Sequence, residues 1–120
     1  MVVERFKNQS RHYQDNALRF LQEGEVQKAS EFFWGSMAQA LKAVAASRGM
    51  ELRSHGLIRQ YARELARELG DESIVDGFRE ADSLHSDFYE AGLTADDVTL
   101  AWETRIRPAL DSLGRLLLEQ

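Results

Sequence analysis

The sequence has no cysteine and a single proline among its 120 residues. Without cysteine, disulfide bonds, thiolate metal sites and cysteine nucleophiles are all excluded. Histidine is also scarce: the chain has 3, none of them in the His-x-x-x-His or His-Glu-x-x-His spacing of a zinc site. We therefore expect no metal site, and we expect no cofactor.

Long apolar runs and an excess of positive charge are missing too. No apolar stretch approaches the ~20 residues that span a bilayer, and residues 1–5 do not resemble the start of a secretory signal. We therefore expect a cytoplasmic protein without a membrane partner. The formal net charge of −5 does not favour a general nucleic-acid binder, because such proteins use excess Lys and Arg against phosphate. A local basic groove remains compatible with an acidic total, so RNA stays open as a partner.

The length and the apolar pattern predict the fold class. One domain fits into 120 residues of which 43% are apolar and 29% charged. Apolar residues recur with a period of about 3.6, whereas period-2 stretches and Asn-Gly or Asp-Gly hairpin signals are absent. We predict a single all-α domain over residues 1–120, an up-and-down antiparallel helical bundle of about five helices.

Glycines and capping residues mark the ends of these predicted helices. Ser54 and Thr94 are the expected N-caps of the third and last helices, and Pro108 is expected to kink or split the last helix near Arg107. The expected helices cover residues 3–22, residues 25–48, residues 54–69, the stretch from Asp71 or Ser73 to Gly92, and the stretch that follows Thr94.

Three apolar faces follow from this assignment. The second helix has a stripe of large residues, Phe33, Met37, Leu41 and Val44. Beside it runs a stripe of small residues that lets a neighbouring helix approach closely, namely Ala29, Ser36, Ala40, Ala43 and Ser47. The third helix is expected to bury Leu57, Ile58, Tyr61, Leu65 and Leu69.

The fourth helix carries the strongest candidate for chemistry. His85 falls in the middle of its apolar face, and Asp82 and Tyr89 lie within side-chain reach, three residues before it and four after it. Arg79 and His85 are about 120° apart on a straight helix. They can serve one site only if Asp82 bridges them, if the helix is distorted, or if a second subunit completes the site.

Three interpretations of this cluster stay open. In the structural one, His85 is buried and bonded to Asp82, and Arg79 makes a surface ion pair. In the catalytic one, Arg79 stabilises a phosphate, His85 transfers a proton, Asp82 orients His85 and Tyr89 is a secondary contact. In the third, the cluster is a contact between subunits.

A second, weaker candidate lies on the second and third helices. Lys42 and Trp34 could frame a nucleotide, with the indole stacked on a base, and His55 could bind an anion at the start of the third helix. The alternative is a core or interface tryptophan, a solvated lysine and a capping histidine. If this set is functional, the protein would sense a small-molecule nucleotide through Trp34, Lys42 and His55.

Two segments together resemble a known superfamily. They are residues 28–43, followed by Arg48-Gly49 and His55, and residues 81–90, followed by Leu93 and Val98. In these segments the chain is similar to the HEPN superfamily (higher eukaryotes and prokaryotes nucleotide-binding domains), and more narrowly to its small stand-alone PaREP-type proteins, found mainly in archaea. The resemblance spans nearly the whole chain.

The resemblance implies four long helices and a shorter one, often in a homodimer. Many HEPN members are, or descend from, metal-independent RNases that have four to six residues between an arginine and a histidine. Arg79 and His85, with five residues between them, satisfy that spacing. Others partner a minimal nucleotidyltransferase in toxin–antitoxin pairs. The resemblance thus implies a nucleotide- or RNA-related role, either as an RNase acting at a dimer groove or as a non-catalytic binding protein in which His85 is structural.

Overall fold

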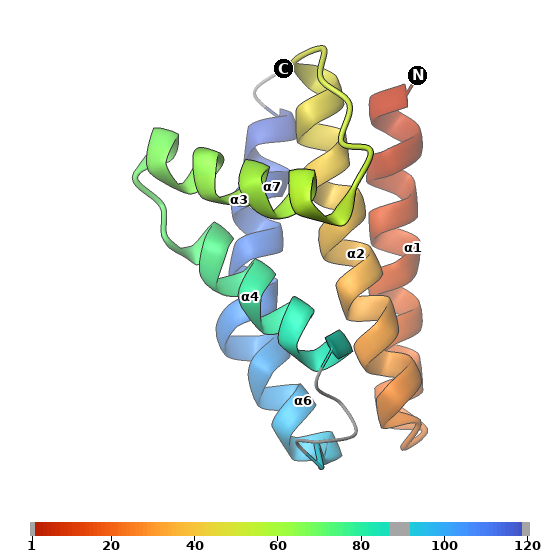
Figure 1. Ribbon diagram of the computed structural model, residues 1–120. Coiled ribbons are helices and arrows are strands. Elements are labelled where there is room, and N and C mark those ends of the chain that lie inside the picture. The colour runs from red at the N-terminus through yellow and green to blue at the C-terminus, as the bar shows by residue number, and fades with distance from the viewer. Residues whose placement is uncertain (1, 87–91, 119–120) are drawn as a thin grey trace.

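The computed structural model describes residues 2–86 and 92–118, and within these ranges the chain is helical and contains no strand. The predicted all-α bundle is confirmed (Figure 1). Its elements are α1 (Val2–Gln22), α2 (Val26–Ser47), α3 (His55–Leu69), α4 (Ser73–Ser86), α6 (Ala95–Ala101), the π-helical segment η1 (Trp102–Ile106) and α7 (Arg107–Leu118). In this part of the chain, no helix is both long and apolar enough to cross a membrane.

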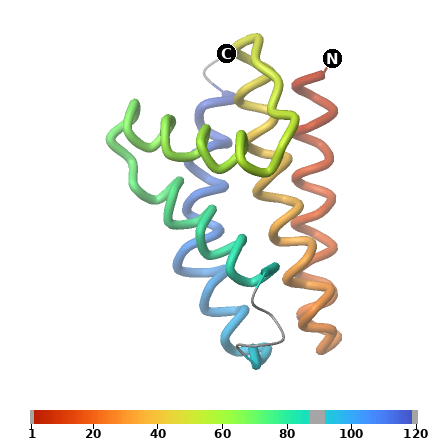
Figure 2. The backbone as a smooth tube through the Cα atoms, in the orientation of Figure 1, coloured from red at the N-terminus to blue at the C-terminus, as the bar shows by residue number. Residues whose placement is uncertain are grey.

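Helices α1 and α2 form the most extensive contact of the bundle, and the tube in Figure 2 shows them antiparallel and side by side. Small residues make this approach possible, as the stripe on α2 predicts. The Ser10 hydroxyl donates to the Ser36 carbonyl oxygen at 2.8 Å, and the Ser36 hydroxyl donates to the Ser10 carbonyl oxygen at 2.9 Å. This reciprocal pair of buried hydrogen bonds satisfies both hydroxyls and sets the register of α1 on α2.

The large stripe of α2 faces the other helices and forms the centre of the core. Phe33 stacks on Trp102 of η1 with ring centroids 5.1 Å apart. Helix α4 contributes the buried residues Ile74, Phe78 and Ala81. The buried residues of α2, α6, η1 and α7 that meet there are Phe33, Met37, Leu41, Val44, Val98, Trp102, Ile106, Ala109 and Leu113.

The predicted helix starts are confirmed in detail. The Ser54 hydroxyl accepts the Leu57 backbone N–H at 3.1 Å. Thr94 and Asp97 form a complete capping box, in which each side chain accepts the backbone N–H of the other residue. The irregularity expected near Arg107 is a π turn, because the Arg107 N–H bonds to the Trp102 carbonyl five residues earlier.

Helix α3 differs from the expectation that consecutive helices lie antiparallel. It lies across the bundle, whereas α1, α2 and the continuous α6–η1–α7 run along it and α4 is inclined between these two directions (Figure 1). Helix α3 packs through its first residue, His55, and through the face of Ile58 and Tyr61, whereas Leu57 lies at the edge of that face and the C-terminal end of the helix projects from the bundle (Figure 1). Leu57 and Leu69 are therefore 43% and 41% exposed, and their predicted burial is wrong. Ala62 and Ala66 are buried instead.

Candidate functional site

The indole of Trp34 contacts the imidazoles of two histidines. The ring centroid of His55, the first residue of α3, lies 4.6 Å from that of Trp34, and that of His85, on α4, lies 5.7 Å from it. Each imidazole is tilted by 24° from the indole plane. Phe78 supports the indole edge-on at 5.5 Å. We call Trp34, His55 and His85 the histidine–indole cluster.

A carboxylate holds each imidazole. His55 Nε2 lies 3.0 Å from Oδ1 of Asp82, and His85 Nδ1 lies 2.9 Å from Oε2 of Glu31. A carboxylate accepts hydrogen bonds, so these two ring nitrogens are the protonated ones. The opposite nitrogens, Nδ1 of His55 and Nε2 of His85, have no hydrogen-bond partner within residues 2–86 and 92–118. Each is therefore available to accept or donate a proton.

Both imidazoles reach solvent. The side chains of His55 and His85 are 41% and 34% exposed. The Arg59 guanidinium lies one helical turn beyond His55, with Nη2 3.8 Å from Oδ2 of Asp82. The cluster thus combines two accessible proton-transfer groups with a cation nearby.

Asp82 does not orient His85, contrary to the catalytic interpretation. Its carboxylate faces His55 and Arg59 on α3, and Glu31 on α2 holds His85 instead. The physical reason is that α3 crosses α4 beside Asp82, which places His55 within hydrogen-bonding distance of the carboxylate. The structural interpretation is wrong in two details, because the His85 side chain is 34% exposed and its Nδ1 pairs with Glu31 and not with Asp82.

Arg79 stays apart from the cluster. Helix α4 is a regular α-helix from Ser73 to Ser86, so Arg79 and His85 remain about 120° apart around its axis. The Arg79 side chain is exposed, and it makes no ion pair with another described residue. Tyr89, the fourth residue of the predicted catalytic set, lies outside the described residues.

The weaker candidate set is brought together. Trp34, Lys42 and His55 line one cavity of about 310 Å³, to which Gln39 and Arg53 also contribute. Ligand sites usually range from about 300 to 1,000 Å³, so this cavity has the size of a small ligand site. It shares Trp34 and His55 with the histidine–indole cluster, so the two sets predicted separately from the sequence are neighbours.

Three further residues belong to this region, and sequence reasoning assigned none of them to it. Glu31 lies three residues before Trp34, and Arg59 lies four residues after His55, so helical spacing places each beside a residue already singled out. Arg53 precedes the N-cap of α3, and its Nη2 pairs with Glu51 at 3.2 Å. No spacing rule connects Arg53, in the loop before α3, to Trp34 on α2.

Comparison with known proteins gives one match. A family model described as the archaeal PaREP1/PaREP8 family matches residues 5–107. No curated protein and no solved structure matches significantly. The matched range includes every residue of the histidine–indole cluster and of the cavity beside it.

Proposed function

This chain belongs to the archaeal PaREP1/PaREP8 family, and we propose that it is a HEPN-like domain that binds RNA or a nucleotide at the histidine–indole cluster. In this proposal His55 and His85 cleave an RNA phosphodiester bond without a metal ion. The observation that carries it is the pair of half-exposed imidazoles on one indole, each with one nitrogen held by a carboxylate and the other available.

Two imidazoles supply the proton transfers that RNA cleavage needs. One takes the proton of the 2′-hydroxyl while O2′ forms a bond to phosphorus. The bond from phosphorus to the 5′-oxygen breaks, and the other imidazole protonates that leaving oxygen. The products are a 2′,3′-cyclic phosphate and a 5′-hydroxyl, and such positioned acid–base catalysis contributes about 10²- to 10⁴-fold in rate.

Cations around the cluster would stabilise the phosphate. Arg59 is 47% exposed beside Asp82, and Lys42 and Arg53 line the adjoining cavity. Guanidinium groups bind phosphate oxygens in bidentate geometry. Arg79 would enter from a second subunit, because it points away from the imidazoles of its own chain. A homodimer that brings two α4 helices together is therefore part of the proposal.

The second candidate function is nucleotide binding without cleavage, by the chain alone or as partner of a minimal nucleotidyltransferase. One observation favours it: the cavity of about 310 Å³ is lined by Trp34, Lys42 and His55 but not by His85. A nucleotide seated there has its base near the indole and its phosphate near Lys42, and only one imidazole touches it. In this case His85 supports Trp34 and does no chemistry.

The deciding experiment is cleavage of labelled RNA in EDTA by the wild type, His55→Ala, His85→Ala and Arg79→Ala. We expect each histidine variant to lose about 100-fold or more in rate. His12→Ala is the matched control, because His12 is exposed on α1 and bonds to Asn16 away from the cluster. Cleavage unchanged in both cluster variants would contradict the catalytic assignment.

Binding and assembly are measured separately. Trp34 fluorescence reports a nucleotide in the cavity, because the other indole, Trp102, is 6% exposed and stacked on Phe33. Saturable quenching by a nucleotide together with no RNA cleavage would establish the second function over the first. Light scattering after size exclusion tests the homodimer, and a monomer at micromolar concentration would refute the role of Arg79 in a shared site.

A further inference from the structure

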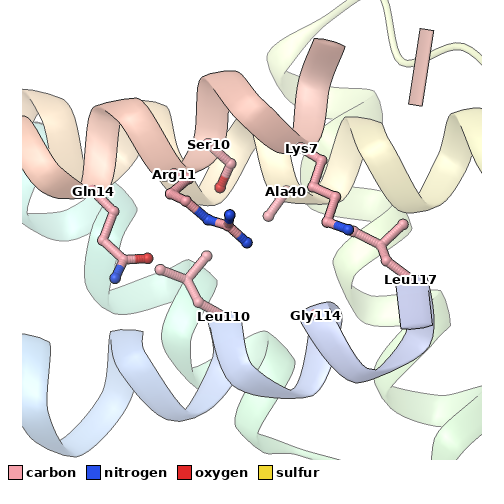
Figure 3. A pocket seen from close by; sticks show the side chains of 8 residues that line it. All are labelled: Lys7, Ser10, Arg11, Gln14, Ala40, Leu110, Gly114 and Leu117. Carbon is pink, nitrogen blue, oxygen red and sulfur yellow. The ribbon is translucent and has the colours of Figure 1, made fainter. Parts of the chain in front are cut away.

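A second polar site lies between α1 and α7. Both helices pack on α2, and a groove of about 110 Å³ remains between them, with Ala40 of α2 at its floor (Figure 3). A water needs roughly 10–15 Å³ measured in this way, so the groove has room for several waters or one small ion. It shares no lining residue with the cavity beside Trp34.

One wall of the groove is cationic and the other apolar. Figure 3 shows Lys7, Arg11 and Gln14 reaching from α1 toward Leu110 and Leu117 of α7. Among residues 2–86 and 92–118, no carboxylate lines the groove. Neither the Lys7 nor the Arg11 side chain makes an ion pair or hydrogen bond with another residue in the described part of the chain. The groove therefore holds two positive charges without a counterion from these residues.

The bundle fixes this arrangement. Ser10, which also lines the groove, donates its hydroxyl to the Ser36 carbonyl and so locks the register of α1. Lys7 and Arg11 are one helical turn apart on the same face. Their common orientation toward the groove thus follows from the α1–α2 packing and needs no ligand to create it.

Gly114 of α7 keeps the groove open. A Cβ added there would meet no atom within 4 Å, so packing does not require a glycine at this position. Glycine inside a helix is destabilising relative to alanine. At Gly77 the reason for the glycine is a close helix contact, because a Cβ there would lie 2.7 Å from the Arg105 carbonyl oxygen. At Gly114 the missing side chain leaves space for an occupant.

We propose that the α1–α7 groove binds a small oxyanion, either inorganic phosphate or the phosphate of a phosphomonoester. Arg11 presents a planar fork that matches two phosphate oxygens, Lys7 adds a second charge, and the Gln14 amide supplies a further donor. The apolar wall of Leu110 and Leu117 limits water on one side, which strengthens these charged hydrogen bonds. The site is independent of the function proposed above.

Titration of the full chain with inorganic phosphate, followed by backbone amide NMR, tests this site. We expect saturable shifts confined to residues 7–14 and residues 110–117. Sodium chloride at matched ionic strength serves as the blank, acetate tests a carboxylate, and glycerol phosphate tests a phosphomonoester. A stronger response to glycerol phosphate than to inorganic phosphate would identify the monoester as the ligand, and the reverse order would identify free phosphate.

Two variants locate the binding. Lys7→Gln/Arg11→Gln should weaken phosphate binding at least 10-fold, because it removes both charged donors. Arg63→Gln/Arg67→Gln, which removes two exposed charges from α3, is the matched control and should bind as the wild type does. Gly114→Leu should abolish binding by filling the groove. No saturable shifts in the wild type, equal responses to chloride and phosphate, or undiminished binding by Lys7→Gln/Arg11→Gln would overturn the proposal.

Discussion

Nε2 of His55 lies 3.0 Å from Oδ1 of Asp82, although the two residues are 27 positions apart on different helices. The contact exists because Ser54 caps α3 at the point where that helix begins to cross the bundle, so the first helical residue faces α4. Asp82 thereby ties α3 to α4 at the edge of the histidine–indole cluster, and it connects two sets of candidate residues.

Asp82→Asn tests whether this contact positions His55 for function. The amide keeps the shape of the side chain but loses its charge and half of its acceptor capacity. We expect RNA cleavage or nucleotide binding to fall about 10-fold, with a stability change below about 1 kcal/mol, because partly exposed ion pairs contribute little. Activity and urea unfolding are measured on the same sample.

Asp76→Asn is the matched control for that change. Asp76 lies on the same helix, and its Oδ2 pairs with Nη1 of Arg105 at 3.4 Å, away from the cluster. The control should lose a comparable small amount of stability and keep full activity. Equal activity loss in the two variants would mean that Asp82 acts through the helix and not through His55.

Helix content and helix ends follow from local signals. Ser54 and Thr94 cap helices as expected, because capping depends on residues within three positions. The stripe of Phe33, Met37, Leu41 and Val44 is buried as expected, because one amphipathic helix specifies its own inner face. These predictions require no knowledge of how the helices are arranged.

Capping residues and amphipathic stripes do not specify how the helices are arranged relative to one another. The crossing of α3 exposes Leu57 and Leu69 and brings His55 to Asp82, and neither result is encoded within a single helix. The partner of His85 was missed for the same reason, since Glu31 lies 54 positions away on α2. Trp34, Lys42 and His55, which the sequence groups as one candidate set, line the same cavity, but their proximity to His85 depends on the tertiary packing.

Gly77 and Gly114 should respond oppositely to alanine. At Gly77 the added Cβ would clash with the Ala109 side chain and lie 2.7 Å from the Arg105 carbonyl oxygen. We expect a loss of about 1–3 kcal/mol, typical of overpacking. At Gly114 the Cβ meets nothing within 4 Å, so Gly114→Ala should gain up to about 1 kcal/mol from helix propensity. Urea unfolding of the two variants measures both effects, and a stability gain at Gly77 would contradict the close approach of α4 to α7.

Asp71 should make stability depend on pH in the acid range. Hydrogen bonds from Ser73, aided by Ser112 and the positive charge of Arg115, lower the pKa of the Asp71 carboxyl below its ordinary 3.8. A lowered folded-state pKa stabilises the fold while the carboxylate is ionised. This stabilisation is present above about pH 4 and is lost as the pH falls through the folded-state pKa.

Asp71→Asn should therefore cost about 1 kcal/mol at pH 7, the usual contribution of such hydrogen bonds, and less at pH 3. Urea unfolding at the two pH values measures the difference. Asp111→Asn, a change at an exposed position of α7, is the control and should show no such change. A cost for Asp71→Asn that stays constant between the two pH values would contradict the assignment.

Tyr61 holds a buried hydroxyl that forms no hydrogen bond of good geometry in the described part of the chain, although the positive charge of Arg48 acts on it. The residue is 5% exposed, and burial raises the pKa of its phenol above the ordinary value of 10.0. Because the folded state keeps the phenolic proton longer than the unfolded state does, stability should fall as the pH rises above about 10.

Tyr61→Phe removes both the unpaired hydroxyl and this titration. We expect its stability at pH 7 to be equal to the wild type or up to about 1 kcal/mol higher, and its alkaline stability loss to be smaller. Tyr61→Leu, which removes the ring as well, should be less stable than either. A loss above about 1 kcal/mol in Tyr61→Phe would show that the hydroxyl has a partner in solution.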